Sequence, residues 1–142
     1  MRFNEQISFI ENLTSVQTLL NKKIDGALSP HGISFTEYMI LSALNRQHNQ
    51  TMRRIDLAQN IGLSASGITR LINPMQKIGL VSKESSPKDA RVSFVKLTQS
   101  GKTIFEESTT SLEMSLKLIL VNISAKQISN TQELFRSLGA SS

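Results

Sequence analysis

Apolar residues at helical spacing divide the first 62 residues into three predicted helices. A long apolar stripe starts at Phe3 and ends near Gly26, before the turn "SPHG". Ser34 and Glu37 form a capping box that opens a second helix, which runs to about Gln47. The segment "HNQTM" then breaks the helical pattern. A short third helix over about residues 53–60 precedes Gly62, and we expect it to bury Ile55, Leu57, Ala58 and Ile61.

The stretch "GLSASGITRLINPMQKIGLV", residues 62–81, predicts a fourth helix with two contrasting faces. Ser64 can cap its first turn. One face is apolar and is expected to be buried, with Ile68, Leu71, Ile72, Met75 and Ile78. The opposite face is polar without a single carboxylate, with Ser66, Thr69, Arg70, Asn73 and Lys77. Two short helices joined at a glycine, the second with a polar outer face, are the helix-turn-helix plan.

The pattern changes period after Gly79 and then becomes helical again. "LVSKES" and "RVSFVKL" alternate apolar and polar residues around the turn "SPKDA", which predicts a β-hairpin. Thr98 or Ser100 can cap the next helix, and Ser124 with Gln127 forms a capping box for a last one. The predicted fold is mostly α with a small β-hairpin wing. This winged helix-turn-helix, residues 33–100, lies between helical arms at 1–32 and 101–142, which we assign to a dimerisation region.

The chain of 142 residues carries a net charge of +5, and all of the surplus lies in its central third. Residues 51–100 hold eight basic and three acidic side chains, whereas the flanking segments balance. A basic centre between neutral arms is typical of a polyanion-binding surface, although charge alone fits a solvated surface equally well. The absence of cysteine excludes disulfides and thiolate metal sites. We find no signal-peptide pattern and no membrane-spanning run, which favours a cytoplasmic protein.

The segments "GISFTEYMILSAL" and "RIDLAQNIGLSASGITRLINPMQKIGLVSKESSPKDARVSFVKLTQSGK" resemble the MarR family of bacterial transcriptional regulators. The resemblance covers nearly the whole chain and is strongest over residues 33–102. Its most specific element is the hairpin with Asp89, Arg91 and the exit "LTQSG". The resemblance implies a homodimer that binds a pseudo-palindromic double-stranded DNA operator, usually as a repressor released by a small ligand.

Side chains that bond to base edges and phosphates without adding negative charge suit a helix that enters the major groove. Arg70 is the best candidate for a guanine contact, and Arg91 resembles the family's wing arginine that enters the minor groove. We assign Asp89 to orienting an arginine. Proline at position 74 either kinks the helix or ends the base contacts at Asn73. The full set of predicted DNA-binding residues is Arg53, Arg54, Ser64, Ser66, Thr69, Arg70, Asn73, Lys77, Lys88 and Arg91.

Partners other than DNA are less sharply defined by the sequence. The run "LKLILVNI" is apolar around more than one helical face, which indicates either a dimer interface or a fully intramolecular core. A small aromatic or lipophilic acid is the effector class that the resemblance implies. Its pocket would involve His31, Phe35, Tyr38 and Met39, which serve equally well as core. No cofactor, metal site or catalytic constellation is predicted, and the alternative function is a winged-helix protein–protein module.

Overall fold

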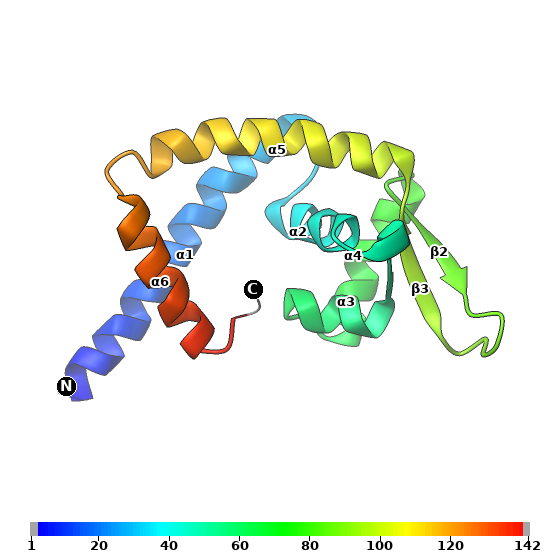
Figure 1. Cartoon of the computed structure of the whole chain (residues 1–142), viewed down its shortest axis with the longest axis horizontal. Helices are drawn as coiled ribbons and strands as arrows, with labels where there is room; N and C mark the ends of the chain where they lie inside the picture. Colours follow the sequence, from blue (N-terminus) through cyan, green and yellow to red (C-terminus); the bar gives the residue numbers. More distant parts are fainter. Residues whose placement is uncertain (1–2, 141–142) are drawn as a thin grey trace.

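The computed structural model describes residues 3–140 and has the predicted order of helical arm, winged domain and helical arm (Figure 1). Its described helices are α1 (Phe3–Leu28), α2 (Phe35–Asn45), α3 (Arg54–Ile61), α4 (Ala65–Lys77), α5 (Gln99–Ile119) and α6 (Ala125–Ser137). Short 3-10 turns, η1 and η2, occupy Ser29–His31 and His48–Gln50. The strands are β1 (Thr51–Arg53), β2 (Val81–Ser85) and β3 (Ser93–Leu97).

The predicted helix starts are confirmed by the hydrogen bonds at their caps. Ser34 Oγ accepts from the Glu37 N–H at 3.2 Å, and Glu37 Oε1 accepts from the Ser34 N–H at 2.9 Å. The same reciprocal bonds join Ser124 and Gln127. Of the two candidates for the cap of α5, the structure uses Thr98, whose side chain accepts from the Gly101 N–H at 3.0 Å. Local sequence therefore sets where these helices begin.

The sheet contains a strand that the hydrophobic pattern did not predict. The sequence indicates only a break at "HNQTM", but Thr51–Arg53 forms β1 and pairs antiparallel with β3. The strand order is β1-β3-β2, with Met52 opposite Val95 in the β1–β3 ladder. A three-residue strand is too short to show a period of two, and it exists because β3 offers it an unpaired edge.

The core of the winged domain forms where α4 packs against the other elements. Ile68, Ile72 and Met75 are completely buried and belong to one cluster with Leu44 of α2 and Leu57 of α3. Full burial of each such side chain contributes about 1.5–3 kcal/mol. This packing fixes which face of α4 points outward, so the core decides the orientation of the polar face.

Two residues predicted to be buried are exposed instead. Ile55 has 55% of its surface exposed, because it lies in the first turn of α3 on the side away from the core residues Leu57 and Ala58. Ile78 is 63% exposed, because it is the C-cap of α4 and its backbone no longer continues the helical face. Leu57 and Ala58 are buried as predicted, whereas Ile61 and Leu71 are half-buried.

Pro74 lies inside α4 without ending the helix. The helix continues to Lys77, and the Pro74 carbonyl accepts a bond from the Ile78 N–H at 3.1 Å. Proline still removes one donor, since it has no N–H to offer the Arg70 carbonyl. The polar face of α4 therefore extends one turn beyond Asn73 to Lys77.

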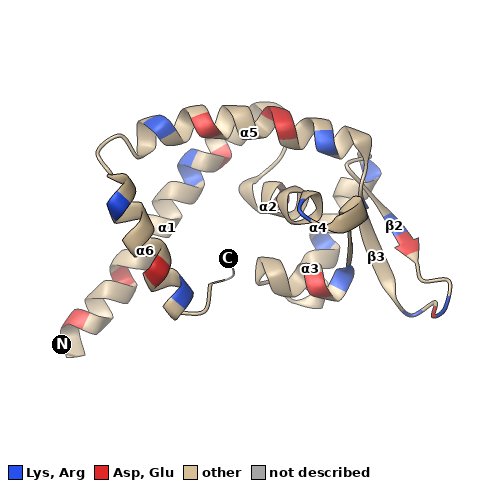
Figure 2. Cartoon of the chain, viewed as in Figure 1, with Lys and Arg blue, Asp and Glu red and all other residues tan. Residues whose placement is uncertain are grey.

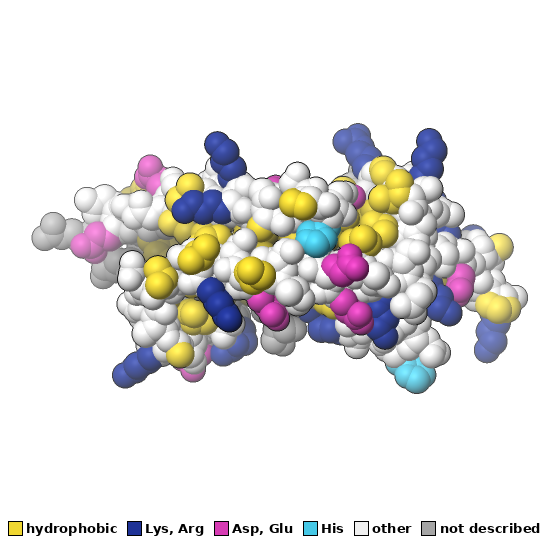
Figure 3. All heavy atoms as spheres, turned by 90° about the horizontal axis from the view of Figure 1, so that it is seen from above, with side chains coloured by type: hydrophobic (Ala, Val, Ile, Leu, Met, Phe, Trp, Pro, Cys, Tyr) yellow, Lys and Arg dark blue, Asp and Glu magenta, His cyan; other side chains and the backbone are white. Residues whose placement is uncertain are grey.

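Helix α5 begins at the winged domain and forms the first part of the C-terminal arm (Figure 1). The domain boundary that we predicted at residue 100 falls in the first turn of α5, so one continuous helix joins the two regions. Ile24 and Leu28 of α1 and Leu112 of α5 are buried between the arm and the winged domain. Farther from that junction the arm helices pack against few other residues of the chain, and every residue of α6 is exposed to solvent. Figure 3 shows apolar side chains spread over the α5 side of the molecule.

Candidate nucleic-acid interface

The outward face of α4 carries the predicted base-reading side chains. Ser66, Arg70, Asn73 and Lys77 are exposed on the face opposite the buried Ile68. No acidic residue occurs in the first turn of α4 or elsewhere along it. A helix placed in a major groove would therefore meet the phosphates with hydrogen-bonding groups and positive charge only.

The first turn of α4 is capped and presents free backbone donors. The Ser64 side chain accepts from the Gly67 N–H at 3.0 Å, and its hydroxyl lies 3.2 Å from that of Ser66. The remaining N–H groups of this turn have no helical acceptor, and they lie at the positive end of the helix dipole. Such an end is suited to a phosphate.

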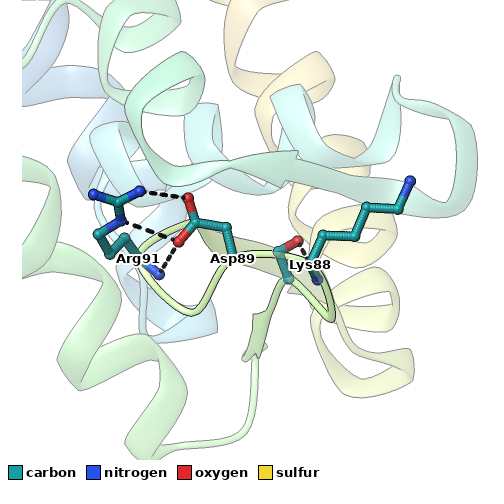
Figure 4. A network of polar contacts seen from close by, with 4 residues as sticks. Lys88, Asp89 and Arg91 are labelled. Atoms are coloured by element: carbon teal, nitrogen blue, oxygen red, sulfur yellow. Dashed lines mark hydrogen bonds and ion pairs between the residues drawn. The ribbon is translucent and has the colours of Figure 1, made fainter.

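The wing holds its arginine through Asp89, as Figure 4 shows. The Asp89 carboxylate accepts from Arg91 Nε at 3.2 Å, from a terminal guanidinium nitrogen at 3.3 Å and from the Arg91 backbone N–H at 2.9 Å. These bonds, those of the side chain first, hold the pKa of the Asp89 carboxyl below its ordinary value. Arg91 is exposed at the wing tip, and Lys88 is exposed beside it, with its backbone N–H bonded to Ser86 Oγ.

The two adjacent arginines at the start of α3 have different environments. Arg53 is the N-cap of α3 and is exposed. Arg54 points toward α4, where its guanidinium donates to Thr69 Oγ1 at 2.9 Å. Its Nε is buried and meets no hydrogen-bond partner among the described residues. The Thr69 hydroxyl in turn donates to the Ala65 carbonyl at 3.0 Å, so this hydroxyl has partners on both sides.

Sequence reasoning missed one residue of this surface, Lys83. The residue lies on β2, and its ammonium donates to Asn73 Oδ1 on α4 at 2.6 Å. Ten residues separate the two positions, and no periodicity connects a helix face to a strand of the wing. The contact exists only because β2 packs beside α4.

The structure brings three of the predicted arginines to one cleft. Arg53, Arg54 and Arg91 line a cavity of about 280 Å³ between α3, α4 and the wing, with Ile55 and Val92 among its apolar residues. Figure 2 shows basic residues on α3, on α4 and at the tip of the hairpin. The basic surplus of the sequence is thus gathered at the winged end of the molecule.

A second cavity, of about 330 Å³, lies between α2 and α3. Phe35, Tyr38 and Met39, which we predicted for a ligand pocket, line it together with Arg46 and other residues of α2 and α3. Tyr38 is anchored to α5, since its hydroxyl lies 2.7 Å from Thr109 Oγ1 and its ring lies 5.2 Å from that of Phe105.

His31 does not join the other three residues of the predicted pocket. Its Nε2 lies 2.7 Å from Ser111 Oγ on α5, so it connects η1 to the long helix instead. Within residues 3–140 no three His, Asp or Glu side chains cluster as metal ligands would. In the same range, no helix has the length and apolar character needed to cross a membrane.

A helix-turn-helix with a carboxylate-free outer helix and an arginine-bearing hairpin defines a winged-helix DNA-binding protein. Comparison with known proteins places the chain within this class. Residues 22–108 match the family model described as transcriptional regulator SarA/Rot, and the chain belongs to this family. The expected MarR-type winged helix-turn-helix is therefore confirmed.

Individual relatives agree with this assignment. The chain is 26% identical over 124 residues to the HTH-type transcriptional regulator YdgJ of Bacillus subtilis, covering 87% of this chain and 73% of the relative. A mutant MarR of Escherichia coli, complexed with operator DNA, superposes with a TM-score of 0.85 at 20% identity, over 98% and 99% of the two chains. CouR of Rhodococcus jostii, bound to p-coumaroyl-CoA, superposes with a TM-score of 0.81 at 19% identity, over 93% and 90%. The protein is a DNA-binding transcriptional regulator, and its family is not one of enzymes.

Proposed function

We propose that the protein is a sequence-specific repressor that binds a pseudo-palindromic operator as a homodimer and releases it when a small aromatic or lipophilic acid binds. The observation that carries the proposal is the outer face of α4. It presents Ser66, Arg70 and Asn73 to solvent with no carboxylate among them, while its inner face is locked into the core.

Each polar residue of this surface has a distinct task in the proposal. Arg70 donates to the O6 and N7 atoms of a guanine in the major groove, the commonest specific contact of arginine. Ser66, Thr69 and Asn73 contact neighbouring base edges. Arg91, held by Asp89, enters the minor groove, where narrow A·T-rich tracts concentrate negative potential. The phosphate contacts come from the start of α4 at Ser64 and from the exposed Arg53, Lys77 and Lys88, with Arg54 behind them.

The arms supply the dimer contact in this proposal. Large apolar side chains are exposed on all three arm helices, among them Phe3, Ile10 and Leu19 of α1, Met114 and Leu118 of α5, and Leu134 of α6 with its C-cap Leu138. A monomer would leave this surface in water, whereas a second copy of the chain would bury it. A two-fold dimer sets two copies of α4 about 34–36 Å apart, which matches successive major grooves. Because its partner is DNA, we place the protein in the cytoplasm.

The cavity between α2 and α3 is our candidate for the effector site. Phe35 and Tyr38 stack at 6.0 Å and offer an aromatic wall, and Arg46 at the same cavity can bind a carboxylate. CouR, which shares the fold, is bound to p-coumaroyl-CoA. An acid bound here would contact α3, the first helix of the helix-turn-helix, and so could alter how α4 is presented.

The test is DNA binding by the wild type and Arg70→Ala, using a fragment from upstream of the protein's own gene and a series of salt concentrations. We expect nanomolar binding by a dimer and loss of sequence preference in Arg70→Ala. With three cations per protomer on phosphates, namely Arg53, Lys77 and Lys88, log K should fall with log[salt] with a slope of about −5. Lys22→Ala on α1 removes the same charge outside the winged domain and should keep the sequence preference.

If binding is weak and depends neither on DNA sequence nor on Arg70, the next experiment is selection of bound fragments from the whole genome. A selection that returns no enriched fragment contradicts the proposed repressor function. Partner binding that ignores both salt and Arg91→Ala would then favour the protein–protein module.

A further inference from the structure

The hydrogen bond between Lys83 and Asn73 joins the wing to α4, the second helix of the helix-turn-helix. Lys83 Nζ donates to Asn73 Oδ1 at 2.6 Å, and both side chains are exposed on the winged domain. A lysine at this place could simply add charge near DNA. The bond to one particular end of the Asn73 carboxamide indicates a more specific role.

A carboxamide has two chemically different ends, an acceptor oxygen and a donor NH₂ group. A lysine ammonium has three donors and no acceptor, so it can bond only to the oxygen. With one lone pair of Oδ1 held by Lys83, the Nδ2 group is the end of Asn73 that keeps its full hydrogen-bonding capacity for a partner outside the protein. The bond therefore determines the orientation of the amide as well as its position.

This orientation changes which base Asn73 can recognise. A free asparagine reads adenine with both ends, donating to N7 and accepting from the N6 amino group. In this protein one of the two lone pairs of Oδ1 already accepts from a cation, so the N6 amino group of adenine must share this oxygen with an ammonium, which weakens that half of the contact. Guanine presents two acceptors, N7 and O6, and no major-groove donor, which suits the remaining Nδ2 donors.

A second polar residue of α4, Thr69, also has hydrogen-bonding groups engaged within the protein. Thr69 donates its hydroxyl proton to the Ala65 carbonyl and accepts from Arg54, so its donor is committed within the protein. The groups of α4 that remain free to donate to bases at its centre are the Arg70 guanidinium and the Asn73 Nδ2. Both match the acceptors of guanine.

We propose that Lys83 is a specificity-determining residue that acts through Asn73: it holds Asn73 Oδ1 and thereby directs Asn73 to guanine instead of adenine. The inference rests on the proposed sequence-specific binding to DNA. It makes Lys83 a positioning residue, because the base is read by Asn73 and not by the lysine. A lysine that only bound phosphate would change the affinity for all sequences by one common factor.

The test is selection of bound sequences from a randomised duplex library, followed by competition between duplexes that differ at one base pair. The base pair read by Asn73 is the one at which Asn73→Ala loses its preference. At that position the wild type should prefer guanine, and Lys83→Met should shift the guanine-to-adenine ratio toward adenine by about five- to tenfold, as expected for regaining half of a bidentate contact. Lys77→Met removes an equal charge from the end of α4 and should lower the affinity for every duplex by the same factor.

A double variant separates positioning from direct contact. If Lys83 acts through Asn73, adding Lys83→Met to Asn73→Ala should leave base preference at that position unchanged. Thermal unfolding of each variant identifies any loss of folding. The inference is overturned if the wild type prefers adenine, or if Lys83→Met leaves the guanine-to-adenine ratio unchanged. Either result leaves the proposed repressor function intact. A library that yields no enriched sequence for the wild type overturns the proposed function itself, and this inference with it.

Discussion

Asp89 accepts three hydrogen bonds from Arg91, two from its guanidinium and one from its backbone N–H, so one carboxylate fixes both the turn and the side chain of the wing. This arrangement makes an acidic residue useful on a DNA-binding surface. Removing this negative charge should therefore weaken binding to DNA, although net charge alone would predict stronger binding.

Asp89→Asn should weaken operator binding, although it makes the protein more positive. The amide keeps the size of the side chain but loses the charge-assisted bonds, so Arg91 samples more orientations before it binds. Because Arg91 is exposed, we expect a modest fall in affinity, by a factor of roughly two to five. Fluorescence anisotropy with labelled operator measures it. Glu84→Gln on β2 is the control for charge, and it should raise affinity slightly. A rise with Asp89→Asn would contradict the orienting role.

The Asp89 carboxyl should titrate below its ordinary pKa, and Arg91→Ala should bring its pKa back up. Arg91 bonds the ionised form, so the carboxylate persists as the pH falls through the ordinary value. Its contribution to ordering the wing is present above that value and is lost only when the pH falls through the depressed pKa. Carbon-13 NMR titration of the carboxyl in both proteins is the measurement. Equal midpoints would show that the pair does not persist in solution.

Gly101→Ala should destabilise the protein, whereas Gly26→Ala should not. Gly101 is buried in the first turn of α5, where an added Cβ would collide with the Leu80 carbonyl oxygen and come within 2.8 Å of Leu97 Cδ1. The backbone and side-chain shifts needed to accommodate the added carbon lower the free energy of unfolding by about 1–3 kcal/mol. Gly26 lies in α1 with nothing within 4 Å of the added carbon, and alanine there should stabilise by about 0.5–1 kcal/mol. Urea denaturation measures both, and equal stabilities would contradict the packing at Leu80.

Leu118→Glu should convert the proposed dimer to a monomer. Leu118 on α5 is 78% exposed in the single chain, so a charge there costs the monomer nothing but would be buried without a partner in an arm-to-arm interface. Sedimentation velocity at micromolar concentration measures the change. Ile78→Glu places the same charge on another exposed apolar residue, this one in the winged domain, and should remain dimeric. A Leu118→Glu protein that stays dimeric would exclude this part of α5 from the interface.

Arg46→Met should weaken the binding of an aromatic acid by about tenfold or more. Arg46 is a cation of the Phe35–Tyr38 cavity, and hydrogen bonds to charged groups contribute about 1.5–3 kcal/mol. Isothermal titration calorimetry with 4-hydroxybenzoate as the probe measures the affinity. His31→Ala provides the contrast, because the structure places His31 on Ser111, outside this cavity. An affinity lowered by His31→Ala and untouched by Arg46→Met would move the site toward η1 and α5.

Local sequence is sufficient to predict the helices, their caps and the two faces of α4. The capping boxes at Ser34 and Ser124 and the left-handed C-cap at Gly62 depend on residues three or four apart. They can therefore be predicted from short stretches of sequence. The apolar spacing from Ile68 to Met75 likewise fixes which side of α4 is buried, and therefore which residues face outward. The pairing of Asp89 with an arginine was also within reach, since Arg91 is only two residues away.

The contacts between side chains that are distant in sequence depend on how the elements pack in three dimensions. Strand β1 exists because the edge of β3 is free, Arg54 turns inward because Thr69 lies across from it, and His31 is drawn to Ser111 eighty residues away. The bond from Lys83 to Asn73 has the same origin, because it requires the hairpin to pack beside the helix. Such contacts depend on how elements are placed in space, and the periodicity of one element carries no information on its distance to another.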